Sequence, residues 1–369
     1  MREEGCGEEE IFAFLSSKRR DDASQEYIMS SMCALPHPVA VRAHSLFMES
    51  NLGDPGLYGG TASIEQLLIR RLGSLFHLPG ACGYATSGGT ESNIQALRIA
   101  RTLKGTEGAN VVLPESAHFS FSKACEMLSL EVRTVPLDGE YRMDTGKILE
   151  HIDSKTCAIV AIAGTTEYGM VDPIPEIAGI AEDLGIFFHV DAAFGGLVVP
   201  FLERPIPFDF EIPGVSSVAV DPHKMGMSTI PAGCLLMRER EMLCTLSVDT
   251  PYLSVKQEFT LTGTRPGAPV AAAFAVLEYL GRSGMRAIVK GCMNNTARLI
   301  EGMETIGFCR AATPDVNVAT FETKETPRQW LVSFTRKGHL RIVCMPHVHR
   351  DRIEKYLQDM ADLHVGKAG

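Results

Sequence analysis

Short apolar segments alternate with helical segments between residues 61 and about 240, and this alternation restricts the possible folds more than any other feature of the sequence. The apolar segments are GYAT (83–86), NVVL (110–113), TCAIVAIA (156–163), IFFHV (186–190), SVAV (217–220) and GCLLM (233–237). Strands that are apolar at every position are buried on both faces, which is typical of parallel sheets covered by helices on both sides. The pattern therefore predicts an α/β domain with a mostly parallel mixed sheet.

The flanking regions have different patterns. Residues 11–50 are predicted to be helical with interruptions, and NLGDPGLYGGT (51–61) is a Gly/Pro-rich loop. Two long helical patterns, three strand candidates and a final amphipathic helix follow residue 267, which indicates a smaller α+β domain. We predict an N-terminal helical segment with an active-site loop at 1–60, a large ligand-binding domain at 61–265 and a small C-terminal domain at 266–369. The polar segment at 248–267 is interpreted as a functional loop.

Charge and composition exclude several kinds of partner. The formal net charge is −10, and acidic and basic residues are mixed along the chain, so no basic block could follow a nucleic-acid backbone. The first ten residues, MREEGCGEEE, are unlike a secretory signal, and no apolar run approaches the ~18 residues that cross a bilayer. Ten cysteines are dispersed without a CxxC pair, which favours small buried residues over a metal or redox motif. We expect a cytoplasmic protein without metal, membrane or nucleic-acid partners.

Glycines and hydroxyl side chains follow the GYAT segment at the start of a helical pattern. Ligands of open α/β sheets bind beyond the carboxyl ends of the strands, and Ser87, Gly88, Gly89 and Thr90 occupy such a position. Glycines let the backbone approach a phosphate, and the first N–H groups of the helix are free to bind it. An ordinary strand-to-helix turn would use the same residues, so this feature alone is a weak signal.

Charged residues follow two later strands in the same manner. Asp191, with the small Ala193 beside it, follows IFFHV, and His223 and Lys224 follow SVAV. A carboxylate can keep the pyridine nitrogen of pyridoxal 5′-phosphate (PLP) protonated, and a lysine can form a Schiff base with its aldehyde. The structural alternatives are an aspartate that caps a turn, a surface lysine and a core histidine.

Two further strand ends complete the pattern. His118 follows NVVL and can lie over an aromatic ring, although a helix-start residue is an equal alternative. Thr165 and Thr166 follow TCAIVAIA and can contact the ring oxygen or the imine of a cofactor. A phosphate turn, a stacking histidine, an aspartate and a lysine occur in the order that one PLP site requires, and this joint occurrence predicts PLP as the cofactor.

The motifs TSGGTESN, HVDAAFGG and DPHKMGM resemble those of the fold-type-I, PLP-dependent group II amino-acid decarboxylases. The segments SSMC (30–33), NLGDPGLYGGT (51–61), TPYL (250–253), GTRPGA (263–268) and LRIVCMPHV (340–348) are similar in particular to the archaeal L-tyrosine/L-aspartate decarboxylases. The resemblance implies a PLP-dependent transferase-like fold and the conversion of L-tyrosine to tyramine for methanofuran, of L-aspartate to β-alanine for coenzyme A, or both. It leaves the choice between these substrates, and glutamate, open.

The resemblance also implies roles for individual residues. It implies a homodimer with active sites at the subunit interface, an imine on Lys224, Asp191 at the pyridine nitrogen and His118 stacked on the ring. The phosphate would lie on the turn of residues 87–90, near His223.

Further implied residues concern the substrate. The resemblance places Tyr252 on a mobile loop, where we expect it to protonate the substrate Cα, and it places Arg341 near a substrate carboxylate. Tyr58 and Arg265 are additional candidate substrate contacts. Tyr58-Gly59-Gly60 departs from the usual archaeal loop sequence, so the substrate preference stays open.

Two other functions are compatible with the motifs. A PLP-dependent lyase acting on a phosphorylated substrate, or a tRNA-dependent cysteine-forming enzyme, would share them, but would need additional basic residues. A non-catalytic PLP-binding or regulatory protein is the other alternative, and the tyrosine in TPYL argues against it.

Overall fold

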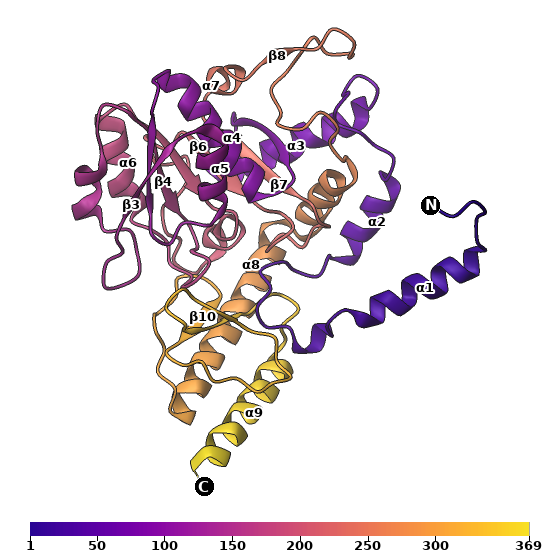
Figure 1. The fold of residues 1–369 in the computed structure, drawn as a ribbon, viewed down its shortest axis with the longest axis vertical. Helices are drawn as coiled ribbons and strands as arrows, with labels where there is room; N and C mark the ends of the chain where they lie inside the picture. Colours follow the sequence, from indigo (N-terminus) through magenta and orange to yellow (C-terminus); the bar gives the residue numbers. More distant parts are fainter. Residues whose placement is uncertain (369) are drawn as a thin grey trace.

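The computed structural model describes residues 1–368, and its central feature is a seven-stranded sheet in the order β1-β7-β6-β5-β4-β2-β3 (Figure 1). The strands are β1 (Cys82–Thr86), β2 (Asn110–Pro114), β3 (Glu131–Val135), β4 (Thr156–Ile162), β5 (Phe187–Asp191), β6 (Ser217–Val220) and β7 (Gly233–Met237). β7 is antiparallel to both neighbours, and the other neighbouring pairs are parallel. The predicted mostly parallel mixed sheet is therefore confirmed.

Helices cover both faces of this sheet, and strand β4 shows why. Its residues 158, 160 and 162 belong to a buried cluster with α4 (Gly89–Lys104) and α5 (Ser120–Leu128). Residues 159 and 161 belong to another cluster with α3 (Gly59–Leu75) and α6 (Ile174–Asp183). Successive side chains of a strand point to opposite faces, so a strand covered on both sides is apolar at most of its positions.

Strand β3 was absent from the predicted set of strands. Its sequence EVRTV contains Glu131 and Arg133, and only Val135 is buried. β3 lies at the edge of the sheet, where a strand is partly solvent-exposed and tolerates charged residues. The apolar pattern therefore identifies the five central strands and the edge strand β1, and it misses the charged edge strand β3.

The N-terminal region is less helical than its sequence predicts. It contains α1 (Glu8–Asp21), η1 (Gln25–Tyr27) and α2 (Pro38–Leu46), joined by irregular segments. Helix α1 has no buried residue, and Figure 1 shows it extending away from the rest of the chain.

The C-terminal region contains the two long helical segments and the strands that the sequence predicts. Helix α8 (Ala268–Ile306) is interrupted at Gly281, whose φ of 58° is left-handed, so it consists of two helices in succession. Strands β10 (Val318–Phe321), β12 (Leu340–Val343) and β11 (Ser333–Phe334) form an antiparallel sheet in this order, and α9 (Arg350–Ala368) follows. The domain boundaries near residues 60 and 265 stay predictions.

The remaining elements are short and lie in connections. They are η2 (Thr145–His151), η3 (Gly195–Leu197), η4 (Val199–Phe201), α7 (Arg240–Cys244), β8 (Val248–Asp249) and β9 (Gln257–Glu258). None of the helices within residues 1–368 combines the length and apolar composition needed to cross a bilayer.

The strand directions bring distant residues to one edge of the sheet. Because β7 is antiparallel to β1 and to β6, strands β1, β2, β4, β5 and β6 all run in the same direction. Their carboxyl ends therefore meet at one edge, which is where ligands of such sheets bind.

Candidate active site

The residues that follow these five strands enclose a cavity of about 270 Å³. Ten of the predicted site residues line it: Ser87, Gly88, Gly89, Thr90, His118, Thr166, Asp191, Ala193, His223 and Lys224. These residues come from five separate strand ends, so the cavity depends on the sheet order and not on a local segment of sequence.

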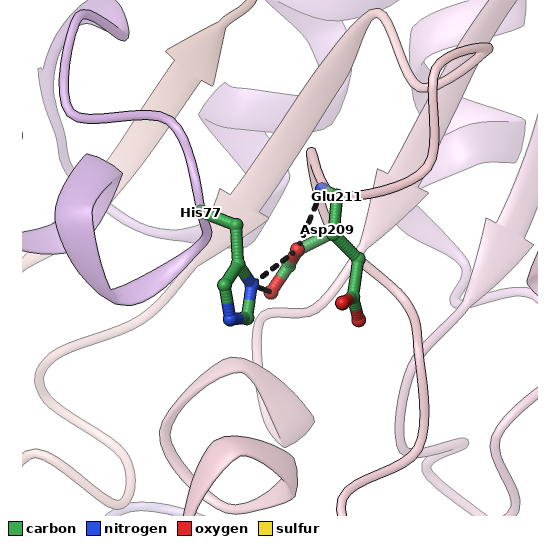
Figure 2. Close-up of side chains that lie close together, drawn as sticks. All are labelled: His77, Asp209 and Glu211. Atoms are coloured by element: carbon green, nitrogen blue, oxygen red, sulfur yellow. Dashed lines mark hydrogen bonds and ion pairs between the residues drawn. The ribbon is translucent and has the colours of Figure 1, made fainter.

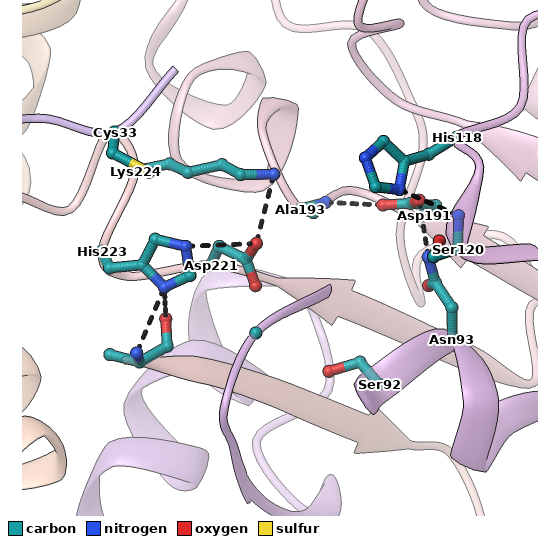
Figure 3. Close-up of polar contacts among 12 residues, drawn as sticks. Cys33, Ser92, Asn93, His118, Ser120, Asp191, Ala193, Asp221, His223 and Lys224 are labelled. Atoms are coloured by element: carbon teal, nitrogen blue, oxygen red, sulfur yellow. Dashed lines mark hydrogen bonds and ion pairs between the residues drawn. The ribbon is translucent and has the colours of Figure 1, made fainter. Parts of the chain in front are cut away.

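Lys224 extends into this cavity and forms an ion pair with a carboxylate (Figure 3). Its Nζ lies 3.1 Å from Oδ2 of Asp221, which is 2% exposed. Burial lowers the pKa of Lys224, but Asp221 and Asp191 together raise it by more, so the pKa is above its ordinary value. The ion pair with Asp221 therefore favours the ammonium form of Lys224.

Asp191 ends β5 and is 6% exposed. Its Oδ1 accepts a hydrogen bond of 3.0 Å from the N–H of Ala193, and its Oδ2 accepts one of 2.9 Å from Nδ2 of Asn93. Two donors stabilise an ionised carboxylate. Asp191 is thus suited to hold a protonated ring nitrogen.

His118 lies above Asp191 in Figure 3 and lines the same cavity. Its Nδ1 accepts a 3.2 Å hydrogen bond from the N–H of Ser120, so the proton of the neutral ring is on Nε2. Burial lowers the pKa of His118, with Asp191 opposing this effect. A neutral imidazole can stack on an aromatic ring without bringing a second positive charge close to Lys224.

The turn of residues 87–90 leads from β1 into α4. Gly88 has a φ of 147°, and a Cβ there would lie 3.2 Å from Cε1 of His223. A Cβ on Gly89 would lie 2.9 Å from Cβ of Ala193. The hydroxyl-bearing Ser87 and Thr90 are exposed at the cavity. Since the α4 N-terminus carries free N–H groups and a partial positive charge, this turn can bind an anion.

His223 is held by the connection that leads into β7. Its Nδ1 lies 2.6 Å from the carbonyl oxygen of Ala232, and its Nε2 lies 3.7 Å from Oδ2 of Asp221. Its Cε1 is also close to Gly88, so the ring lies beside the turn of residues 87–90.

Thr165 does not present its hydroxyl to the cavity. Its Oγ1 accepts a hydrogen bond of 2.9 Å from the N–H of Met170 within a tight turn, whereas Thr166 lines the cavity. Both threonines follow β4, and the geometry of the turn places only Thr166 in the cavity wall.

The three substrate candidates Tyr58, Arg265 and Arg341 lie outside the cavity lining in one chain. Arg265 is buried and forms an ion pair of 2.6 Å with Glu65, and it also donates to the carbonyl oxygen of Ala85.

Arg341 is 6% exposed and donates to the carbonyl oxygen of Thr166 and to Oγ of Ser333. Among residues 1–368, its Nη2 has no hydrogen-bond partner. Because Thr166 lines the cavity, Arg341 is adjacent to the cavity wall and retains an unused donor.

Tyr252 lies between β8 and β9 and is 86% exposed. The segment that contains β8 projects from the body of the chain in Figure 1. Within one chain, Tyr252 does not line the Lys224 cavity.

Three polar residues of the cavity were not predicted from the sequence: Asn93, Ser116 and Asp221. Asp221 follows SVAV as Asp191 follows IFFHV, so the strand-end argument could have identified it. Ser116 follows β2 in the same way. Asn93 lies in the second turn of α4, and no sequence pattern distinguishes it from other helix residues.

The residues present fit PLP. The cavity offers an anion-binding helix N-terminus, an amine and a carboxylate, which match the phosphate, the aldehyde and the basic ring nitrogen of this cofactor. In the described part of the chain, Asp221 Oδ1 and Ser116 Oγ are buried without a hydrogen-bond partner, so polar groups of the cavity wall remain available to a polar ligand.

A separate polar cluster joins two loops near the end of α3 (Figure 2). Nδ1 of His77 lies 3.0 Å from Oδ1 of Asp209, and the same oxygen accepts a 3.0 Å hydrogen bond from the N–H of Glu211. These hydrogen bonds compensate for the burial of the Asp209 carboxylate, which is 1% exposed. We therefore interpret the cluster as a structural connection between the end of α3 and the loop that precedes β6.

Residues 57–313 match the family model described as the pyridoxal-dependent decarboxylase conserved domain. A Methanoculleus marisnigri protein named "Probable L-tyrosine/L-aspartate decarboxylase" is 66% identical, with 98% of this chain and 99% of that protein covered. An Archaeoglobus fulgidus protein named "Probable L-aspartate decarboxylase" is 47% identical, with 95% and 98% covered.

Solved structures share the fold. A Burkholderia pseudomallei sphingosine-1-phosphate lyase has a TM-score of 0.90 at 24% identity, covering 99% of this chain and 92% of that one. A Lactobacillus brevis glutamate decarboxylase has a TM-score of 0.91 at 18% identity, covering 99% and 94%. At such identities the similarity concerns the fold alone.

Proposed function

Because this chain belongs to the pyridoxal-dependent decarboxylase family, we propose that it removes the α-carboxylate of L-tyrosine, of L-aspartate or of both, with Lys224 as the covalent attachment point of PLP. The observation that carries the residue assignment is the convergence of Lys224, Asp191 and the α4 N-terminus on one cavity. The relatives named for tyrosine and aspartate support these substrates.

Bound PLP supplies an electron sink for the electrons of the bond that releases CO2. The chain's own groups then have separate tasks. Asp191, which accepts two hydrogen bonds, holds a proton on the ring nitrogen, and the turn of residues 87–90 binds the phosphate. Asp221, whose Oδ2 lies 3.1 Å from Lys224 Nζ, holds the lysine side chain at the cavity and stabilises its ammonium form.

The orientation of the substrate decides which bond breaks. His118 lies on the side of the cavity above Asp191 and limits the positions that a bound ring can take (Figure 3). A fixed ring lets the protein present the Cα–carboxylate bond in the orientation that favours its cleavage.

We propose Tyr252 as the acid that protonates Cα after CO2 leaves. Its exposure in a single chain supports a role in which it enters the cavity of a partner subunit or moves with its loop. Tyr252→Phe is expected to reduce the decarboxylation rate by about 100-fold, the lower range for loss of a general acid, and to increase by-products. Product analysis by mass spectrometry measures both, and an unchanged rate and product ratio would show that another acid acts.

The same proposal includes a homodimer and a cytoplasmic location. Helix α1 supports the dimer, because Ile11, Phe12, Phe14 and Leu15 are exposed on it and no residue of α1 is buried.

Arg341 supports aspartate as one substrate. Within residues 1–368 its buried guanidinium has no carboxylate partner within hydrogen-bonding distance, and Nη2 is unbonded. A second carboxylate on the substrate could supply that partner, whereas tyrosine offers none. Arg341 would then bind the side-chain carboxylate and leave the α-carboxylate free to depart.

The test is to incubate PLP-loaded protein separately with tyrosine, aspartate and glutamate, and to measure CO2 and identify the amine. We expect tyramine, β-alanine or both, and no CO2 from Lys224→Ala. Absence of CO2 with all three amino acids would contradict the proposal. It would then favour the alternative, a lyase on a phosphorylated substrate or a tRNA-dependent cysteine-forming enzyme.

A further inference from the structure

A chain of buried hydrogen bonds leads from Asp191 away from the cavity. Nδ2 of Asn93 donates to Oδ2 of Asp191 at 2.9 Å, and Oδ1 of Asn93 lies 2.9 Å from Nε2 of His189. Nδ1 of His189 lies 2.8 Å from Oγ of Ser217. Asn93, His189 and Ser217 are at most 1% exposed. His189 and Ser217 contact neither the cavity nor solvent, so contact with a ligand does not explain them.

The chemistry of these groups determines where each proton lies. An ionised carboxylate only accepts, so Asn93 must direct its NH2 group at Asp191 and its carbonyl oxygen at His189. A carbonyl oxygen also only accepts, so Nε2 of His189 carries the proton. Nδ1 of the neutral ring is then an acceptor, and Ser217 donates to it. Every donor in the chain therefore points toward Asp191.

Burial keeps His189 neutral, which this arrangement requires. It lowers the pKa of His189 to about 4, although the Asp191 carboxylate partly opposes the shift. A protonated His189 would donate from both ring nitrogens and would remove the hydrogen bond that Ser217 makes to Nδ1.

Asn93 also connects Asp191 to the segment that carries His118 (Figure 3). Its Nδ2 donates to Oγ of Ser120 at 3.0 Å, and the N–H of Ser120 donates to Nδ1 of His118 at 3.2 Å. One amide group thus binds the carboxylate beneath the predicted ring nitrogen and the residue that orients the predicted stacking histidine.

We propose that Asn93 and His189 are positioning residues of this site: His189 fixes the Asn93 amide, and the amide holds the Asp191 carboxylate in place and in register with His118. This inference rests on the roles proposed above for Asp191 and His118. It predicts that the proton arrangement already exists in the cofactor-free protein and that losing it weakens PLP binding.

Three variants separate a positioning role from simple filling of space. His189→Phe fills the site without a donor, whereas His189→Gln can place an N–H near the position of Nε2. Asn93→Asp keeps the shape of the side chain but removes the donor to Asp191. We expect Asn93→Asp to raise the PLP dissociation constant by about 10-fold or more, the effect of losing a hydrogen bond to a charged group. We expect His189→Phe to raise it by about 2- to 10-fold, the effect of losing a hydrogen bond between neutral groups, and His189→Gln to recover most of the affinity. Equilibrium dialysis measures these constants, and thermal unfolding checks the fold of each cofactor-free variant.

Nitrogen-15 NMR of the unaltered, cofactor-free protein provides a measurement that needs no variant. We expect a protonated Nε2 and an unprotonated Nδ1 for His189 at pH 7. A proton on Nδ1, or equal PLP affinity of His189→Gln and His189→Phe, would overturn the proposal. Neither the NMR measurement nor the PLP dissociation constants depend on which amino acid is decarboxylated. If the proposed function fails, CO2 release is absent while the His189 proton positions and the PLP affinities still match the expectation.

Discussion

At the scale of single residues, the site is organised by buried carboxylates. Asp191 is held by two N–H donors, while Asp221 has Lys224 as its ionic partner and, within residues 1–368, an Oδ1 without a hydrogen bond. Two nearby carboxylates thus face different surroundings. We infer that Asp191 binds the ring nitrogen, because two N–H donors hold its carboxylate in place. We infer that Asp221 binds the lysine amine, because the two form an ion pair.

Lys224→Ala is expected to abolish the visible absorption band of the lysine-bound cofactor and the decarboxylase activity, because no amine remains at this position of the cavity. Absorption spectra of purified protein with added PLP measure the band. Lys290→Ala is the matched control, because Lys290 does not line the cavity and forms an ion pair with Glu203 in which both side chains are exposed. Retention of a lysine-bound band in Lys224→Ala would contradict the assignment.

His189 predicts part of the pH dependence of stability. Its pKa falls from an ordinary value of 6.5 to about 4 because it is buried. Between these values the unfolded chain binds more protons, so the free energy of unfolding decreases as the pH falls through this interval, by up to about 3 kcal/mol.

His189→Gln removes this titration, so its melting temperature should fall less between pH 6.5 and 4.5 than that of the wild type. Thermal unfolding of both cofactor-free proteins in matched buffers measures the difference. Parallel melting curves across this pH range would show that His189 does not contribute.

At the scale of elements, the connection between β1 and α4 determines whether an anion can bind. The close approach of residues 88 and 89 to His223 and Ala193 leaves little room for side chains. The glycines therefore keep the first N–H groups of α4 accessible, and the helix supplies the favourable partial charge.

Gly88→Ala is expected to destabilise the protein by about 1–3 kcal/mol and to weaken PLP binding, because φ is 147° and the new Cβ would lie 3.2 Å from His223. Thermal unfolding and PLP titration measure the two effects. Gly179→Ala is the control: this glycine lies within α6, and a Cβ there meets no atom of the described residues within 4 Å, so stability should rise by up to about 1 kcal/mol with PLP affinity unchanged. Equal behaviour of the two variants would argue against a special role for the turn.

At the scale of the whole molecule, one chain contains the Lys224 cavity but leaves Tyr252 outside it. The proposed homodimer resolves this separation if each cavity takes Tyr252 from the partner. Helix α1, with its exposed apolar side chains, is then expected to be covered in the same dimer.

Mixed dimers test this arrangement. Lys224→Ala and Tyr252→Phe are each expected to have little activity, but a dimer with one subunit of each contains one complete site if Tyr252 acts across the interface. Unfolding and refolding an equal mixture should therefore restore about one quarter of the wild-type activity. Sedimentation of the refolded sample verifies the dimer, and activity no higher than the mean of the two variants would contradict a shared site.

Much of this protein is determined by local sequence. Mostly apolar segments predict β1 and the five central strands, because strands covered on both faces are apolar at most positions. Ser87, His118, Asp191 and Lys224 each lie at or soon after the end of one of these segments. The edge strand β3 escaped prediction because its solvent-exposed positions carry charges.

Tertiary structure decides which side chains form hydrogen bonds with one another. Thr165 and Thr166 are neighbours in sequence, yet the Thr165 hydroxyl accepts a hydrogen bond from the N–H of Met170, whereas Thr166 lines the cavity. Arg265 is engaged by Glu65, which lies 200 residues away. Asn93 and His189, 96 residues apart, become partners only when α4 packs on β5. The sequence by itself determines the strands and the reactive groups at their ends, because both depend on local patterns. The hydrogen bonds that orient those groups join distant segments, so only the packed structure decides them.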